Sequence, residues 1–202
     1  MALKRGHTLS IIAVILLVVD QVTKILVKTN MRIGESISVL GDWWQILFVE
    51  NPGMAFGMSF GGDIGKYILT ILRIVLVVLM LVYLRKLLKE RAPMGVCVGI
   101  TMILVGALGN IIDCMFYGLL FGPSTVMSVA EFLPEGGGYA PFMLGKVVDM
   151  CYFPLIDTTW PSWVPWLGGE ELVFFRPVFN IADSCITVGA FYLLLFQWKF
   201  FS

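Results

Sequence analysis

Four runs of mostly apolar residues constrain the fold of this chain more than any other feature. They cover residues 9–27, 67–84, 94–112 and 178–198, and a helix needs about 20 such residues to cross the hydrocarbon core of a bilayer. The chain is also 58% hydrophobic and only 14% charged, with a mean hydropathy of +0.89, a composition typical of membrane proteins. We therefore predict an all-α membrane protein with four transmembrane helices, in which residues 1–202 form a single domain.

Basic residues near the ends of these runs predict the orientation in the membrane. They gather before the first run, between the second and third, and after the fourth: Lys4, Arg5, Arg85, Lys86, Lys89, Arg91 and Lys199. Because such residues favour the cytoplasmic side, we expect both termini to be cytoplasmic. The two long loops, 29–66 and 113–177, then face outward.

The charge balance and the rare residue types exclude several kinds of function. Fourteen basic residues equal fourteen acidic ones, so no charge excess favours nucleic acid as a partner. The single histidine, His7, leaves no set for a histidine-ligated metal or a serine–histidine triad. The four cysteines form no CxxC pair. We expect neither a metal nor a cofactor, and carboxylates remain as the candidates for chemistry.

Three of the apolar runs carry a carboxylate toward the outer side of the membrane. At about 1.5 Å per helical residue, Asp20 lies roughly 16 Å and Asp113 roughly 28 Å from the cytoplasmic ends of their runs, and Asp183 lies about 7 Å from the outer end. Acids at such depths are costly, and they normally face a partner or a water-filled cavity.

Two of these acids belong to polar stripes on single helix faces. Gly106, Asn110 and Asp113 share one face of the third run, and Asn180 and Asp183 share one face of the fourth. Either stripe alone is equally well explained as polar contact between helices. Two stripes at one depth favour a shared polar site.

A pair of close carboxylates is sufficient for peptide hydrolysis. Two such groups share one proton, so that one takes a proton from water while the other donates to the substrate carbonyl oxygen. Asp149 lies in the second long loop and could also reach Asp183. From the residues alone, the pair is either Asp113 with Asp183 or Asp149 with Asp183.

Neighbouring segments predict the surroundings of this site. Asp20 and Lys24 lie one turn apart in the order that favours an intrahelical ion pair. Asn51 begins a turn, Asn-Pro-Gly, at the same outer level. Residues 36–49 mix β-branched and aromatic residues around a Gly-Asp turn, which predicts a small interfacial hairpin. Residues 119–145, rich in Gly and Pro, predict a long irregular loop.

Five ordered blocks closely resemble bacterial lipoprotein signal peptidase, the type II signal peptidase. They run from the first helix into the fourth: Asp20-Gln-Val-Thr-Lys24, Glu50-Asn-Pro-Gly-Met-Ala-Phe-Gly57, Gly106-Ala-Leu-Gly-Asn-Ile-Ile-Asp113, Val147-Val-Asp149 and Phe179-Asn-Ile-Ala-Asp-Ser184. Any one block alone would be a weak match. Together, in order on a four-span frame, they are specific and cover almost the whole chain.

The resemblance implies an intramembrane aspartic peptidase that cuts diacylglyceryl-modified prolipoproteins just before the lipidated cysteine. It implies a location in the bacterial cytoplasmic (inner) membrane, with the site toward the outer face, a small β-cradle at residues 36–49, and membrane lipids and prolipoproteins as partners of a monomer. The catalytic pair maps onto Asp149 and Asp183. The supporting positions are Asn51, Asn110, Asp113, Asn180, Gly106, Asp20 and Lys24.

The chain departs from the family pattern in two ways. The family usually has Arg after the third-block Asp, and Cys114 stands there; Lys146 or Arg176 is our hypothesis for a substitute cation. The links on either side of Asp149 are also longer than usual, with insertions at 119–145 and 152–176 that we expect outside the membrane.

Two other classes of function compete with this hypothesis. A small transporter or channel would use buried acids to relay ions or protons, and a scaffold would use them for helix contacts. The clustering of the acids in the outer half and the absence of a repeated helix pair favour the peptidase.

Overall fold

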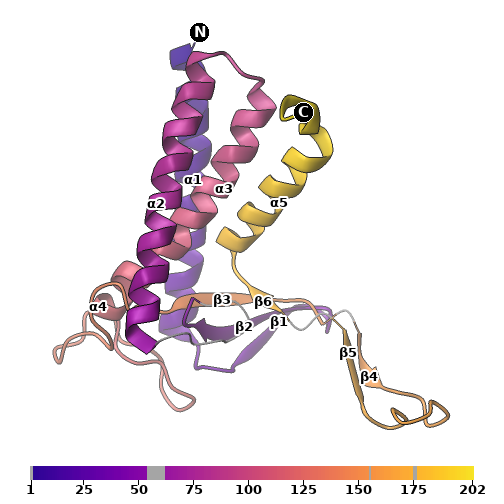
Figure 1. The fold of residues 1–202 in the computed structure, drawn as a ribbon. Coiled ribbons are helices and arrows are strands. Elements are labelled where there is room, and N and C mark those ends of the chain that lie inside the picture. The colour runs from indigo at the N-terminus through magenta and orange to yellow at the C-terminus, as the bar shows by residue number, and fades with distance from the viewer. Residues whose placement is uncertain (1, 54–61, 155, 175–176) are drawn as a thin grey trace.

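The computed structural model describes residues 2–53, 62–154, 156–174 and 177–202. Its four main helices are α1 (Ala2–Asn30), α2 (Gly62–Lys89), α3 (Met94–Ile112) and α5 (Ile181–Phe196). Both chain ends lie at one end of the helices, and a β-sheet lies across the other end (Figure 1). The polar segments and the apolar helices are thus separated along the helix axes, as a membrane protein requires.

Helix α3 is the centre of the bundle. It packs against α1, α2 and α5. Of the residues in its most apolar stretch, 56% are buried inside the molecule, compared with 17% in the corresponding stretch of α1 and 11% in that of α2. The remaining faces of α1 and α2 expose long apolar side chains such as Ile15, Ile68 and Leu79. Exposed faces of this kind are stable in contact with lipid and not in water.

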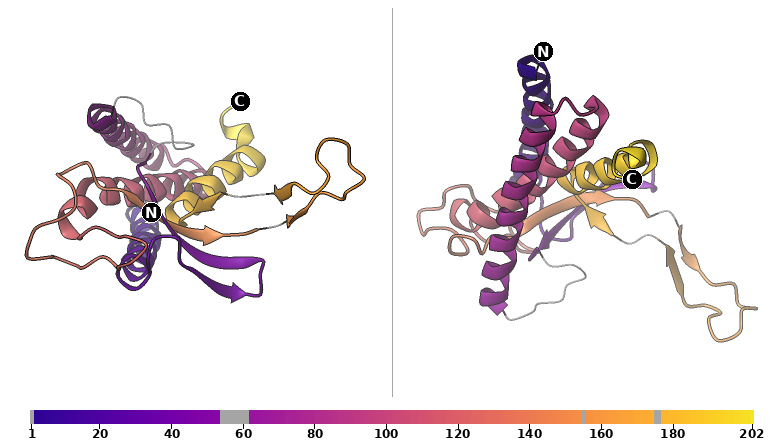
Figure 2. Two further views of the ribbon diagram at one scale, coloured as in Figure 1. Left: turned by 90° about the horizontal axis from the view of Figure 1, so that it is seen from below. Right: turned by 45° about the horizontal axis from the view of Figure 1, so that its top comes forward.

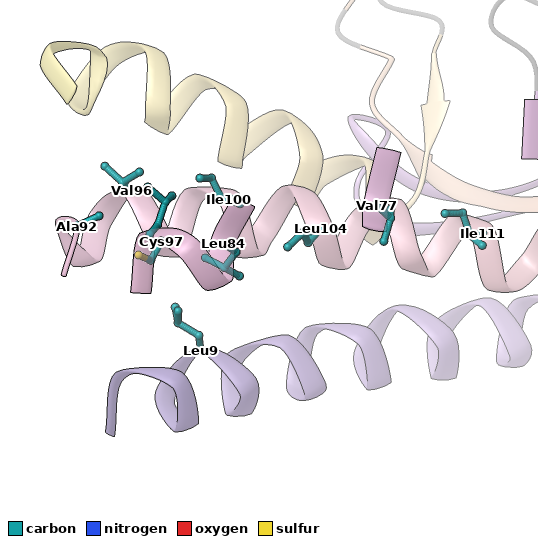
Figure 3. Packing of buried hydrophobic residues seen from close by; sticks show 10 residues of the cluster. Leu9, Val77, Leu84, Ala92, Val96, Cys97, Ile100, Leu104 and Ile111 are labelled. Carbon is teal, nitrogen blue, oxygen red and sulfur yellow. The ribbon is translucent and has the colours of Figure 1, made fainter. Parts of the chain in front are cut away.

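An apolar core joins α1, α2 and α3 and runs along α3 from Val96, near the chain ends, to Ile111, near the sheet. Figure 3 shows its side chains from α1, α2, α3 and the link between α2 and α3. The buried members are Leu9, Val77, Leu84, Leu87, Ala92, Val96, Cys97, Ile100, Leu104 and Ile111. The cluster consists of hydrophobic side chains, so it holds the helices together and offers no carboxylate for chemistry.

The fourth predicted span is shorter than expected. Residues 178–179 form strand β6 (Val178–Phe179), and α5 begins only at Ile181 and ends at Phe196, before a 3₁₀ turn at Trp198–Phe200. Sixteen residues rise about 24 Å, less than the hydrocarbon thickness of about 30 Å. Within the described residues, three helical segments are long and apolar enough to cross a membrane: Lys4–Asn30, Gly62–Lys89 and Met94–Leu120.

Both predicted loops begin later than expected, and the first also ends earlier. Helix α1 continues to Asn30, and α2 starts at Gly62. Helix α3 continues through a π-helical turn (Asp113–Tyr117) into the short α4 (Gly118–Leu120). A π-turn leaves some helix carbonyls unpaired; here the insertion supplies donors, because the Gly145 N–H donates to the Cys114 carbonyl at 2.8 Å.

Close contact between α3 and α5 depends on glycine. A Cβ atom at Gly106 would lie 2.2 Å from the Ala182 carbonyl oxygen, and one at Gly109 would lie 2.6 Å from an Asp20 carboxylate oxygen. Small residues let helix backbones approach in this way in a membrane. Gly106 therefore belongs to the helix packing that places Asp183.

The predicted hairpin at residues 36–49 is confirmed and is part of a larger antiparallel sheet. Strands β1 (Ser36–Leu40) and β2 (Trp44–Asn51) pair with each other, and the sheet order is β1-β2-β3-β6, where β3 is Val147–Tyr152. In this register Asn51 lies opposite Val147, and Cys151 lies opposite Phe179. The sheet thus joins three of the five sequence blocks.

The two insertions lie at the sheet end of the molecule. Residues 121–146 form an irregular lobe on one side, and β4 (Ile156–Thr159) with β5 (Glu171–Phe174) forms a hairpin that extends from the other (Figure 2). Trp163 and Trp166 in this hairpin are 81% and 96% exposed. The irregular conformation predicted for residues 119–145 is observed after Leu120.

Candidate active site

A small polar cavity lies where the ends of α3 and α5 meet the sheet. Its volume is about 180 Å³. The described residues that line it come from five separate segments of the chain: Asn51, Gly53, Arg73, Asn110, Val147, Asp149 and Asp183. Both members of one of the two alternative carboxylate pairs, Asp149 and Asp183, therefore face one space.

Asp149 is held in the cavity wall by two amides. It is 3% exposed, and its carboxylate accepts hydrogen bonds from the Asn180 side chain at 2.7 Å and from the Asn51 side chain at 3.1 Å. Burial, reinforced by the nearby charge of Asp183, raises the pKa of Asp149 to about 7, although the two amide hydrogen bonds oppose this rise. A carboxyl group with that pKa can hold a proton near neutral pH.

Asp183 is fixed by the start of α5. The Asn180 side chain accepts a hydrogen bond from the Asp183 backbone N–H at 2.8 Å, and the Asp183 carboxylate accepts one from the Asn180 backbone N–H, a reciprocal capping box. The Asn110 side chain donates a second hydrogen bond to this carboxylate at 2.8 Å. Asn180 thus contacts both carboxylates, which explains why this asparagine precedes the helix.

Asp113 lies behind the cavity, in a buried charge cluster. The Lys24 ammonium contacts Asp113 at 2.8 Å, Asp20 at 3.0 Å and the Asn110 side-chain oxygen at 2.9 Å. Gln21 donates to Asp113 at 3.0 Å. The predicted Asp20–Lys24 pair is therefore confirmed, and Asp113 is already neutralised by it. This geometry favours Asp149 over Asp113 as the partner of Asp183.

The same cluster connects the helices to the sheet. The Asp20 carboxylate accepts a hydrogen bond from the Ala182 backbone N–H at 2.8 Å, and the Asp113 carboxylate accepts one from the Val148 backbone N–H at 3.3 Å. Val148 and Ala182 are each the residue before a cavity carboxylate. The predicted supporting residues Asp20, Lys24 and Asp113 thus act on the site through the backbone, without lining it.

A second buried charge cluster attaches the insertion at 119–145 to the sheet. Glu50 is bound by Lys28, by Ser124 at 2.8 Å and by Lys146 at 2.9 Å. Burial alone would raise the pKa of Glu50, but the hydrogen bonds from Lys28 and Lys146 outweigh it and hold the pKa below its usual value. Lys146 contacts Glu50 in this cluster and is not among the described residues that line the cavity, which disfavours our hypothesis that it replaces the missing arginine.

Of the described residues, the cation that lines the cavity is Arg73 of α2. Its Nη1 atom is 3.9 Å from the Cys114 sulfur, beside the position where the family usually has arginine. The sequence contained a signal for it, because Arg73 is the lone charge in an otherwise apolar run, and such residues usually have a function. The other candidate, Arg176, lies outside the described residues, as do residues 54–57 of the second block.

The fold and the site together define a class of protein: a polytopic membrane protein that holds a pair of carboxylates in a polar cavity at one end of its helices. Comparison with known proteins identifies the family. The model of the family described as signal peptidase (SPase) II matches residues 12–199, and the chain belongs to this family.

Individual relatives agree with this assignment. The lipoprotein signal peptidase of Porphyromonas gingivalis is 48% identical over 194 residues, which cover 96% of this chain and 84% of the relative. That of Amoebophilus asiaticus is 37% identical over 91% of this chain and 75% of the relative. A solved bacterial membrane enzyme has a TM-score of 0.58 at 26% identity, over 97% of this chain and 90% of that one.

Proposed function

We propose that this protein is an aspartic endopeptidase that removes the signal peptide from diacylglyceryl-modified prolipoproteins, cutting before the lipidated cysteine. The observation that carries the proposal is the shared cavity of Asp149 and Asp183, held by Asn180. Family membership supports the substrate class, since the relatives are lipoprotein signal peptidases. We place both termini in the cytoplasm and the cavity toward the outer face of the inner membrane.

In the proposed reaction, a water molecule occupies the cavity between the two carboxyl groups. Asp183, ionised, takes a proton from this water, and the water oxygen attacks the carbonyl carbon of the residue before the lipidated cysteine. Asp149, protonated, donates its proton to the carbonyl oxygen. The tetrahedral intermediate collapses when the C–N bond breaks: the cysteine nitrogen accepts a proton from Asp183, and one hydroxyl of the intermediate returns a proton to Asp149 as the carbonyl re-forms, which restores both carboxyl groups to their starting states. The products are a free signal-peptide carboxylate and a free cysteine amine.

This mechanism uses no metal and no cofactor. Lys24, Asp20 and Asp113 keep the backbone of both carboxylates in place, and Asn51, Asn110 and Asn180 orient their oxygens. A transporter would also bury acids, but it would leave them free to bind ions or protons. Here Asp20 and Asp113 are instead paired with Lys24. That pairing and the family assignment favour the peptidase over the transporter and the scaffold.

The test of this proposal is cleavage of a defined substrate by the purified full-length chain in lipid. A prolipoprotein carrying the S-diacylglyceryl group should be cut at the bond before the modified cysteine, with the products identified by mass spectrometry. The same precursor with serine in place of that cysteine cannot be lipidated and should remain intact. Cleavage of both precursors, or of neither by folded protein, would contradict the proposed function.

The raised pKa of Asp149 predicts how the rate depends on pH. An acid whose pKa is about 7 is protonated below that pH and loses its proton as the pH rises through it. The reaction requires the protonated form, so kcat/KM should be steady below about pH 7 and then fall, approaching tenfold for each further unit. Initial rates between pH 6 and 9 test this, with unfolding followed at each pH as control. A rate that stays constant to pH 9 would refute the assignment of the proton to Asp149.

A further inference from the structure

Arg73 is a charged residue within the apolar part of α2, a helix whose side chains mostly face lipid or the apolar core. Helix α2 is the least buried of the three long helices, yet this one side chain turns to the polar cavity and lines it with Asp149 and Asp183. Placing a guanidinium at this depth is costly. The cost implies that the group is retained for an interaction inside the cavity.

Among the described residues, the contacts of Arg73 use only part of its hydrogen-bonding capacity. Its Nη2 atom donates to the Gly53 carbonyl oxygen at 2.6 Å, and Nη1 makes only a long contact of 3.9 Å with the Cys114 sulfur. A guanidinium has five N–H donors. Within the part of the chain that the structure describes, no carboxylate forms an ion pair with it. The side chain is therefore positioned but not neutralised.

A glycine makes room for the guanidinium. Gly53 has φ of 85°, and a Cβ atom there would lie 3.2 Å from Nη1 of Arg73 and 3.4 Å from the Cys114 sulfur. The Gly53 N–H donates to the Asn51 side-chain oxygen at 2.9 Å, and Asn51 in turn donates to Asp149. The guanidinium thus lies against the turn that holds one carboxylate, at a defined place beside it.

We propose that Arg73 binds a backbone carbonyl oxygen of the substrate next to the scissile bond, and so holds the peptide against Asp149 and Asp183. A peptide drawn into this cavity brings carbonyl acceptors that must leave water, and the unused N–H groups of Arg73 are charged donors for them. Arg73 thus supplies, from α2, the positive charge that the family usually has at the position of Cys114. This inference rests on the proposed function.

The experiment removes the arginine at position 73 and introduces one at position 114. The purified enzyme in lipid is compared with Arg73→Ala, Arg73→Lys, Cys114→Arg and the double variant Arg73→Ala/Cys114→Arg on the diacylglyceryl prolipoprotein. Arg73→Ala should lower kcat/KM about 10- to 100-fold, chiefly by raising KM, because a hydrogen bond from a charged group to the substrate is lost. The double variant should recover most of this loss, since the new side chain starts from the place that the guanidinium reaches. Arg85→Ala, on the same helix but outside the cavity, is the matched control and should match wild type.

Two further measurements separate substrate binding from support of the turn. If Arg73 only braces Gly53 and Asn51, Arg73→Ala should shift the pH at which the rate falls and leave KM unchanged, which would overturn the proposal. A substrate with ether-linked chains lacks ester carbonyls but keeps the peptide; if Arg73→Ala has no effect on it, the bound oxygen belongs to the lipid and the proposal fails. Wild type that does not cleave at all refutes the proposed function instead, so the two failures are distinguishable.

Discussion

Asp149→Asn and Asp183→Asn should each lower kcat/KM at least about 1000-fold on the diacylglyceryl prolipoprotein. Each asparagine keeps the shape of the aspartate but can neither take a proton from water nor give one to the carbonyl oxygen, and proton transfer of this kind contributes typically 10²- to 10⁴-fold. Product formation by the purified variants in lipid, followed by mass spectrometry, measures the effect. The two losses should not add in the double variant, because the carboxyl groups act as a unit.

Matched variants show whether the loss is specific. Asp42→Asn changes an exposed aspartate in the turn between β1 and β2 and should retain the wild-type rate. Asp113→Asn tests the other pair that the sequence left open; since Asp113 is bound to Lys24, it should destabilise the protein and retain more activity than Asp149→Asn. A folded Asp149→Asn or Asp183→Asn variant with wild-type activity would exclude the dyad.

Lys24→Met should lower the free energy of unfolding by about 3–5 kcal/mol, the usual cost of removing one partner from a buried ion pair. Lys24 is fully buried between Asp20 and Asp113, so its loss leaves two carboxylates without a counter-charge. Methionine fills much of the same volume, which limits the effect of a cavity. Unfolding in mixed micelles with increasing denaturing detergent measures the change.

The control for this variant is another lysine in an intrahelical pair. Lys86 lies 3.8 Å from Glu90, and both side chains are more than half exposed, so Lys86→Met should change stability by less than about 1 kcal/mol. Equal effects of Lys24→Met and Lys86→Met would show that the buried cluster does not stabilise the fold. A loss of activity in Lys24→Met larger than its loss of folded protein would show that the cluster also positions Val148 and Ala182.

Local features of the fold were predictable from the sequence. Hydropathy located the helices because each apolar run consists of residues that are neighbours in the sequence. The hairpin at 36–49 was predictable in the same way, from a turn and the residues beside it. The Asp20–Lys24 pair was predictable because helical spacing alone brings the two side chains together. The end of α3 was not, because its π-turn depends on hydrogen bonds from Gly145 and other residues far along the chain.

The limits of the sequence are clearest at the site. By itself the sequence determined the membrane class, the helical segments, the dependence on carboxylates and, through resemblance, the family and the candidate pair. Only the tertiary structure decided that Asp113 is neutralised by Lys24, that Lys146 is bound to Glu50, and that Arg73 lies beside Cys114. Helical periodicity and hydropathy act over a few residues, whereas these contacts join segments that meet only when helices pack closely at glycines such as Gly106 and the sheet joins β2 to β3.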